Sequence, residues 1–201
     1  MRTDKSKNWN MRRELKILSL KEIDGLKGAC DTFTDQIIVY GLLYTGMRVN
    51  ELCNMNAGWI NLDDETITIP KEQGTFHPKI VKVVKGGKLK KIYCANRTIK
   101  ILNPVLVNIL ERMIKYNYKL RLNRKQVWLR LNQLWEKTGA KDRISPHLLR
   151  HTCLTFMCRK SISIPSVAAQ AGHHNTDVTT RLYVHPDDFY ALKEIADKGG
   201  I

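Results

Sequence analysis

Hydrophobic positions at the start of the chain follow a helical period. An apolar run over Asp35–Tyr44, ended by Gly46, predicts a helix, and Val49–Met55 continues with a further helical turn or two. Upstream, Ser19 and Glu22 stand three residues apart, which is the spacing of a capping box at a helix start. The first quarter of the chain is therefore expected to be helical.

The period changes from helix to strand in the middle of the chain. Thr66–Ile69 alternates polar and apolar positions, as a half-buried strand does. Two more β-rich runs, Lys79–Val84 and Leu89–Cys94, flank the pair Gly86-Gly87, and this arrangement predicts a hairpin with a tight glycine turn. We expect one small antiparallel sheet here.

The helical period returns after the hairpin and continues to the end. We expect helices from Pro104 through Met113, over Leu129–Lys137, from Pro146 to about Lys160, from Pro165 to Gly172, and over Asp187–Asp197. The predicted fold class is α+β and mainly helical. One domain over residues 19–201, with a C-terminal tail from about 184 to 201, follows a basic N-terminal arm or linker stub over residues 1–18.

Composition narrows the class of partner. The chain has 201 residues, 43% hydrophobic and 26% charged, as is typical of a globular protein, with a formal net charge of +15. Residues 71–137 contain 17 Lys and Arg against 3 Asp and Glu, whereas the remaining 134 residues contain 17 against 16. A basic middle between neutral ends indicates a polyanionic partner: DNA, RNA or an anionic membrane.

The ends of the chain and the cysteines bear on its compartment. Residues 1–10 lack the apolar core of a secretory signal, and the longest apolar stretch, Ile37–Tyr44, is far short of the roughly 20 residues that span a bilayer. The five cysteines are odd in number and form no CxxC pair, which disfavours a disulfide framework or a zinc site. We expect a reducing intracellular compartment, the cytoplasm with its nucleoid, and no membrane association.

Three segments carry residues suited to a phosphodiester. In Thr45-Gly46-Met47-Arg48-Val49-Asn50-Glu51-Leu52, Glu51 lies one helical turn after Arg48 and can brace its guanidinium. In Pro146-His147-Leu148-Leu149-Arg150-His151-Thr152, an imidazole and a guanidinium leave one face of a helix. In the third, Ala171-Gly172-His173-His174 is followed by Thr179-Thr180-Arg181-Leu182-Tyr183-Val184-His185-Pro186, which contains Tyr183. Each alone is also typical of a surface ion pair, a helix cap or a core tyrosine.

Together and in this order, the three segments resemble the tyrosine recombinase (phage integrase) family of site-specific DNA recombinases. The resemblance covers about Leu18 to His185. It implies a catalytic domain in which an Arg, a Lys on a β-hairpin, a His-x-x-Arg pair, a Gly-His and a nucleophilic Tyr act together. The matching positions in this chain are Arg48, Lys88, His147, Arg150, His173 and Tyr183.

Two of these assignments stay open on the sequence. The hairpin offers Lys85 as well as Lys88, and Gly172 is followed by His174 as well as His173. Most family members also place a DNA-gripping helical domain before the catalytic one, whereas about eighteen residues precede the resemblance here. The sequence therefore fits either a fragment or an enzyme with a catalytic domain only.

The resemblance implies phosphoryl transfer through a 3′-phosphotyrosyl intermediate, with no cofactor and no metal. Tyr183 would attack a DNA phosphate, and Lys88 would protonate the leaving 5′-oxygen. The one acidic run, Asp63-Asp64-Glu65, sits in a turn before a strand, where a solvated loop is expected rather than a magnesium site. The basic middle of the chain would bind the phosphate backbone of the DNA. The residues expected to make these contacts are Lys79, Lys82, Lys85, Lys90 and Lys91.

The expected partner is double-stranded DNA at specific attachment sites. The family resemblance implies a homotetramer on DNA, and a monomer in solution is compatible with it. We expect a viral or other mobile-element integrase in preference to an enzyme that resolves chromosome dimers. Two alternatives remain: a type IB topoisomerase-like enzyme with the same tyrosine chemistry, and a DNA-binding module without catalysis. A basic RNA-binding protein is disfavoured because stacking motifs are lacking.

Overall fold

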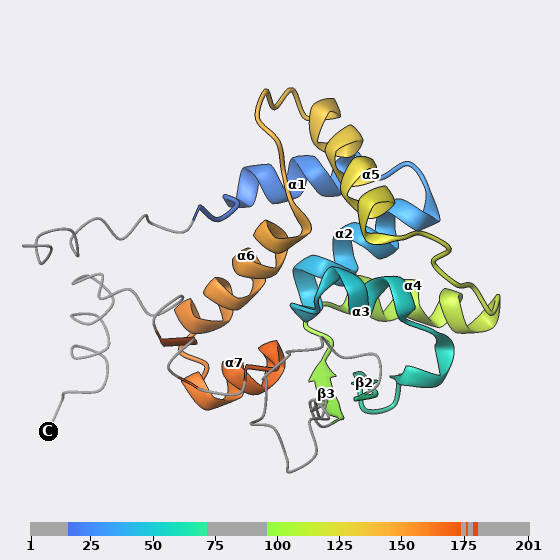
Figure 1. Cartoon of the computed structure of the whole chain (residues 1–201), viewed down its shortest axis with the longest axis vertical. Coiled ribbons are helices and arrows are strands. Elements are labelled where there is room, and N and C mark those ends of the chain that lie inside the picture. Colours follow the sequence, from blue (N-terminus) through green and yellow to red (C-terminus); the bar gives the residue numbers. More distant parts are fainter. Residues whose placement is uncertain (1–15, 72–95, 174–175, 177–178, 181–201) are drawn as a thin grey trace, which may run out of the picture.

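An apolar helix occupies the middle of the molecule, and five other helices pack against it (Figure 1). The computed structural model describes residues 16–71, 96–173, 176 and 179–180. Within these residues the helices are α1 (Leu20–Gly28), α2 (Phe33–Thr45), α3 (Val49–Asn54), α4 (Pro104–Lys115), α5 (Arg124–Lys137), α6 (Pro146–Arg159) and α7 (Ile164–Ala171), with a 3-10 turn η1 (Ala57–Trp59). The central helix is α2, which contacts α1, α3, α4, α5 and α6.

The described part of the sheet has three antiparallel strands in the order β1 (Ile60–Asn61), β2 (Thr66–Ile69) and β3 (Arg97–Lys100). In the register, Ile67 lies opposite Ile99, and both are fully buried on the face that joins the core. The acidic run 63–65 forms the exposed turn between β1 and β2. The mainly helical fold with a small antiparallel sheet is therefore as predicted.

Element boundaries differ from the predicted ones where side chains cap a helix. Helix α2 begins two residues early because the Thr32 hydroxyl accepts from the Asp35 backbone N–H and the Asp35 carboxylate accepts from that of Thr32. Helix α5 begins five residues earlier than predicted, for the same reason, at Asn123 and Gln126. Strand β3 was not predicted. The predicted hairpin runs and the helix over 187–197 lie outside the described residues.

One hydrophobic core extends through the helices and one face of the sheet. Leu18, at the end of the predicted N-terminal arm, is fully buried in it, and its backbone N–H donates to Thr152 Oγ1 on α6 at 3.0 Å. A smaller cluster joins α6 to α7 through Cys153, Leu154 and Val167. None of the helices in the described ranges is long and apolar enough to cross a membrane.

Helix α7 and strand β3 are joined by one buried amide. Gln170 is 7% exposed; its Nε2 donates to the carbonyls of Thr45 and Lys100, each at 2.8 Å, and its Oε1 accepts from the Lys100 backbone N–H at 3.0 Å. The amide thereby ties together the C-terminal ends of α2 and α7 and the last residue of β3. This junction is where the candidate site lies.

Candidate active site

The site forms where α2 and α7 end, and both helices end on a glycine in the left-handed conformation. Gly46 and Gly172 each have φ of 65°. This backbone region suits glycine because it has no Cβ. At such ends the last carbonyl oxygens have no intrahelical partner and carry the negative end of the helix dipole. The ends of α2 and α7 therefore present backbone carbonyls that can accept hydrogen bonds from a cation between them.

Arg150 fills this space. Its side chain rises from α6, is 3% exposed, and donates from Nη1 to the Gly46 carbonyl and from Nη2 to the Ala171 carbonyl at 2.7 Å. The guanidinium has two terminal nitrogens in a fixed planar arrangement, so it can donate to both carbonyls at once. The buried charge is therefore held by the C-terminal ends of two helices, and its orientation is fixed before any ligand binds.

Arg48 binds the next carbonyl at the end of α7, that of Gly172. It is the N-cap residue of α3; its Nη2 donates to the Gly172 carbonyl at 3.0 Å and its Nη1 to Glu51 Oε1 at 3.2 Å. Glu51, one turn on, is fully buried, and its Oε2 also accepts from the Arg48 backbone N–H at 2.6 Å. The predicted Arg48–Glu51 contact is present in the structure.

His173 follows Gly172 and contacts Arg150. Its Nε2 lies 3.3 Å from Arg150 Nη2, and its Nδ1 lies 2.9 Å from Thr179 Oγ1. Because a guanidinium only donates, Nε2 is the acceptor, and the proton of the neutral ring is on Nδ1, which donates to Thr179. Burial, together with the positive charges of Arg150, Arg48 and Arg97, lowers the pKa of His173 to about 4.

Two more histidines stand on α6. His147 is exposed, and its ring meets that of the buried His151 edge to face at 4.3 Å between centroids. Loss of solvent around the ring, followed by the charges of Arg150 and Arg48, lowers the pKa of His147. Burial, His147 and Arg150 lower the pKa of His151 to about 4. Both rings are therefore neutral at pH 7.

The structure brings together Arg48, Glu51, His147, Arg150 and His173. The other predicted site residues lie outside the described residues: Lys79, Lys82, Lys85, Lys88, Lys90, Lys91, His174 and Tyr183. Within the described ranges no group of three or more His, Cys, Asp or Glu side chains forms a metal-ligand set.

Three residues that complete the site were not among the predicted site residues: Arg97, Gln170 and Thr179. Arg97 and Gln170 lie outside the three motif segments, whereas Thr179 belongs to the third, in the Thr-Thr-x-x-Tyr block before Tyr183. The alternation of Arg97-Thr98-Ile99-Lys100 is the one signal that identifies β3, and it places Arg97 and Ile99 on one face of the sheet.

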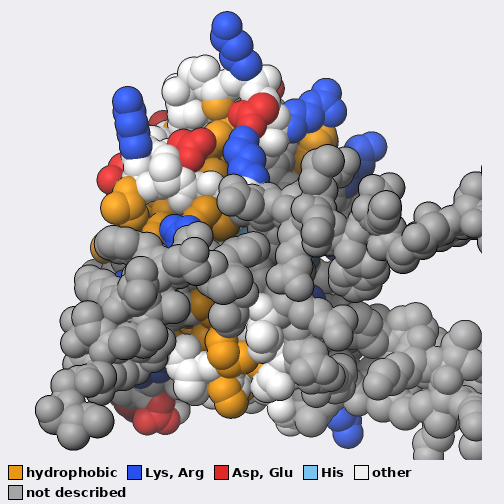
Figure 2. All heavy atoms as spheres, turned by 90° about the vertical axis from the view of Figure 1, so that its left-hand side faces the viewer, with side chains coloured by type: hydrophobic (Ala, Val, Ile, Leu, Met, Phe, Trp, Pro, Cys, Tyr) orange, Lys and Arg blue, Asp and Glu red, His pale blue; other side chains and the backbone are white. Residues whose placement is uncertain are grey.

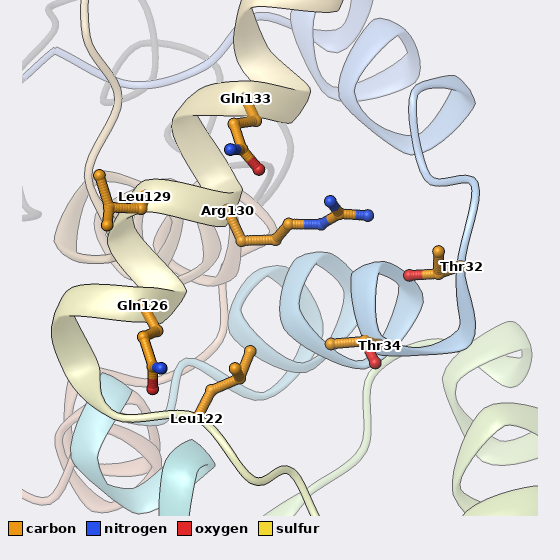
Figure 3. A pocket seen from close by; sticks show the side chains of 7 residues that line it. All are labelled: Thr32, Thr34, Leu122, Gln126, Leu129, Arg130 and Gln133. Atoms are coloured by element: carbon orange, nitrogen blue, oxygen red, sulfur yellow. The ribbon is translucent and has the colours of Figure 1, made fainter.

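A separate hollow of about 410 Å³ lies between the N-terminal end of α2 and α5 (Figure 3). Thr32 and Thr34 line it from one side, and Leu122, Gln126 and Arg130 from the other. It lies at the end of α2 opposite Gly46, so it is not part of the site.

The sequence is similar to those of known tyrosine recombinases. The family model for the phage integrase family matches residues 16–189. The XerA tyrosine recombinase of Pyrococcus furiosus is 30% identical over 184 residues, which cover 85% of this chain and 56% of the relative. That of Pyrococcus horikoshii is 28% identical over 195 residues, covering 90% and 60%. The chain thus spans less than two thirds of the length of these relatives.

Solved structures show the same fold. A crystal structure of XerA recombinase aligns with a TM-score of 0.69 at 22% identity, covering 92% of this chain and 66% of that one. The catalytic domain of bacteriophage HP1 integrase aligns with a TM-score of 0.60 at 18% identity, covering 92% and 95%. With the family model matched over most of its length, the chain belongs to the phage integrase family and has the fold of a tyrosine recombinase catalytic domain.

Proposed function

We propose that this chain is the catalytic part of a site-specific DNA recombinase that cleaves and rejoins DNA through a 3′-phosphotyrosyl intermediate. The observation that carries the proposal is the pair Arg48 and Arg150, fixed on the carbonyls of Gly46, Ala171 and Gly172. Two oriented guanidinium groups suit a phosphate that gains negative charge in its transition state. Relatives named tyrosine recombinases support it.

The reaction exchanges one phosphodiester for another. The Tyr183 phenol oxygen attacks the phosphorus, the bond to the 5′-oxygen breaks, and a bond from tyrosine to the 3′-phosphate forms. His147, neutral at pH 7, takes the phenol proton, and Lys88 supplies a proton to the leaving 5′-oxygen. Arg48 and Arg150 bind the non-bridging oxygens, and Glu51 orients Arg48. His173 adds a hydrogen bond to the phosphate once its proton is on Nε2. The reverse steps rejoin the strand.

A suicide substrate tests this reaction. DNA nicked close to a candidate cleavage position loses a short fragment after cleavage, so the covalent adduct accumulates. We expect an adduct with the wild-type chain and none with Tyr183→Phe. An equal adduct in Tyr183→Phe would overturn the proposal, and a chain that binds DNA without any adduct would favour the binding module without catalysis.

Two assignments within the proposal have a chemical test. A substrate with a 5′-bridging phosphorothiolate needs no proton on its leaving group. It should restore cleavage in Lys88→Ala; restoration in Lys85→Ala alone would move the role to Lys85. For the histidine, the contact with Arg150 favours His173, so His173→Ala should slow cleavage more than His174→Ala.

Double-stranded DNA is the proposed partner. Among structural neighbours, the Tn1549 transposon integrase, aligned with a TM-score of 0.66 at 16% identity, was solved in complex with transposon right end DNA. The basic middle of the chain, including Lys79, Lys82 and Lys90, would supply phosphate contacts, so affinity should fall steeply with salt and neutralising these lysines should flatten the slope. In contrast, the face in Figure 2 shows Lys and Arg mixed with Asp and Glu where it is described.

The assembly and the biological setting follow from the same proposal. Recombination joins two duplexes, so we propose a homotetramer on attachment-site DNA, to be measured by sedimentation with and without DNA. Four of the five cysteines lie in the described residues and carry free thiols, which fits a reducing intracellular compartment. A mobile-element or viral integrase remains our preferred role. Recombination between two sites, compared with relaxation of a plasmid lacking them, separates it from a topoisomerase.

A further inference from the structure

Arg97 donates to both oxygens of the buried carboxylate of Glu51, although it belongs to none of the motif segments. It is the first residue of β3 and lies opposite Ile69 of β2. Its Nη1 donates to Glu51 Oε1 at 2.7 Å and its Nη2 to Glu51 Oε2 at 2.8 Å. This is the two-pronged geometry in which a guanidinium and a carboxylate bind most strongly.

The carboxylate of Glu51 is shared unequally between two arginines. Arg48 reaches it through a single side-chain bond of 3.2 Å, on the oxygen that Arg97 also occupies at 2.7 Å. The second oxygen accepts from the Arg48 backbone N–H and from Arg97. The Arg97 side chain therefore binds both carboxylate oxygens, whereas the Arg48 side chain binds one.

Arg97 also abuts the residue that holds the other end of Arg48. A Cβ atom on Gly172 would stand 2.4 Å from Arg97 Nη1 and 2.8 Å from its Cδ, so the guanidinium lies directly against the Gly172 backbone. The Gly172 carbonyl in turn accepts from Arg48 Nη2. Both groups that fix the Arg48 guanidinium, one from α3 and one from the end of α7, are thus packed against one side chain of the sheet.

We propose that Arg97 is a positioning residue, which holds Glu51 and Gly172 so that the Arg48 guanidinium faces the DNA phosphate in one orientation. The catalytic consequence rests on the proposed function, whereas the positioning itself does not. Arg97 is assigned to the carboxylate and not to the phosphate, because both of its terminal nitrogens donate to the two oxygens of Glu51. Its action passes through Arg48.

Lysine cannot replace Arg97 in this role. An ammonium group is a point charge on a flexible stem, whereas the guanidinium binds both carboxylate oxygens in one plane. Arg97→Lys keeps the charge beside Glu51 and removes the fork, and Arg97→Gln removes the charge as well. A loss of catalytic geometry of this kind costs about 100-fold in rate.

The chain offers a matched control at the far end of α2. Arg130 binds Asp35 with the same two-pronged geometry, from Nε to Oδ1 at 2.6 Å and from Nη2 to Oδ2 at 2.9 Å, and Asp35 is fully buried. Figure 3 shows the Arg130 side chain extending from α5 beside the hollow near Thr32. Arg130→Gln and Arg130→Lys therefore report what the loss of a buried ion pair costs without reaching the site.

Two measurements on the folded chain decide the proposal. The first is the nitrogen-15 spectrum of the Arg48 guanidinium, assigned by its loss in Arg48→Lys. We expect hindered rotation, with separate Nη signals, in the wild type and in both Arg130 variants, and merged signals in both Arg97 variants. The second is single-turnover cleavage of the suicide substrate, which should slow about 100-fold in Arg97→Gln with DNA affinity little changed.

A double-mutant cycle separates positioning from general destabilisation. In an Arg48→Lys background Arg97→Gln should cost little further rate, because the guanidinium through which it acts is gone. Where Arg97→Gln fails to fold, Arg97→Lys carries the same measurements. Unchanged Arg48 signals in the Arg97 variants overturn the proposal, and so does a rate loss that adds in full to that of Arg48→Lys. If the wild type forms no adduct, the proposed function fails, and the Arg48 signals still decide the positioning.

Discussion

Replacing Gly172 with alanine tests the packing on which the site depends. At φ of 65° an alanine is strained by about 1–2 kcal/mol. Its Cβ would also fall 2.4–2.9 Å from three atoms of Arg97, too close for the side chain to remain in place. Arg97 then has to leave the fully buried Glu51, and loss of one partner of a buried ion pair costs about 3–5 kcal/mol.

Arg48 remains as a second partner of Glu51, so the lower end of that range applies and the expected total is about 4–5 kcal/mol. Gly139 provides the matched control. It also has a positive φ, of 83°, and no atom lies within 4 Å of where its Cβ would be. Gly139→Ala should therefore cost the backbone strain alone, about 1–2 kcal/mol.

The assay is urea denaturation at pH 7, followed by tryptophan fluorescence, on each variant alone and in an Arg97→Ala background. Removing the Arg97 side chain removes the clash, so in that background Gly172→Ala should cost no more than Gly139→Ala. Equal costs for the two glycines in the wild-type background, or an undiminished Gly172→Ala cost without Arg97, would refute the reasoning.

Two further predictions concern other parts of the site. Gln170→Leu should lower the free energy of unfolding by about 3 kcal/mol, because it leaves three backbone groups at the ends of α2 and β3 without their partner. A loss within about 0.5 kcal/mol, as at an ordinary surface position, would show that these hydrogen bonds do not stabilise the fold. The pKa of His151 is about 4 in the folded chain and near 6.5 in the unfolded chain. Between pH 6.5 and pH 4 the unfolded chain therefore binds a proton on His151 that the folded chain does not, and stability falls as the pH drops through this range. His151→Phe should lose less stability than the wild type between pH 7 and pH 4.5 in the same denaturation assay, and an equal loss would show that His151 titrates normally.

The fold could be predicted wherever local chemistry determined it. Pro146 and Gly172 mark helix ends through backbone restrictions that act within a few residues, and α6 and α7 begin and end close to where the sequence predicts. Helix α5 was predicted too short because its first turn is exposed and polar, and a side-chain cap at Asn123 rather than an apolar period starts it.

The candidate site could be predicted only where its residues stand in local sequence motifs. Arg48, Glu51, His147, Arg150 and His173 stand in short motifs whose spacing is itself informative. Most of the groups that fix the two arginines are distant in sequence, and three of these groups are the backbone carbonyls of Gly46, Ala171 and Gly172, which carry no residue signature. The role of a strand arginine that binds a carboxylate on α3 appears only when the chain is folded.

The geometry also explains why glycine stands at both helix ends. Each allows the chain to turn in a left-handed conformation, and each presents its own carbonyl to an arginine: Gly46 to Arg150 and Gly172 to Arg48. A side chain on Gly46 would meet Leu154 at 3.2 Å, and one on Gly172 would displace Arg97. The glycines of the two motifs therefore hold the arginines, and the charge of the site is oriented by the backbone.

The proposed function requires that Tyr183 form a covalent bond to a DNA 3′-phosphate. The most direct measurement is to digest the accumulated adduct with nuclease and protease and to sequence the modified peptide by mass spectrometry. We expect a nucleotide attached through phosphate to the Tyr183 side chain, in a peptide that is unmodified in the Tyr183→Phe protein. Attachment at any other residue would contradict it.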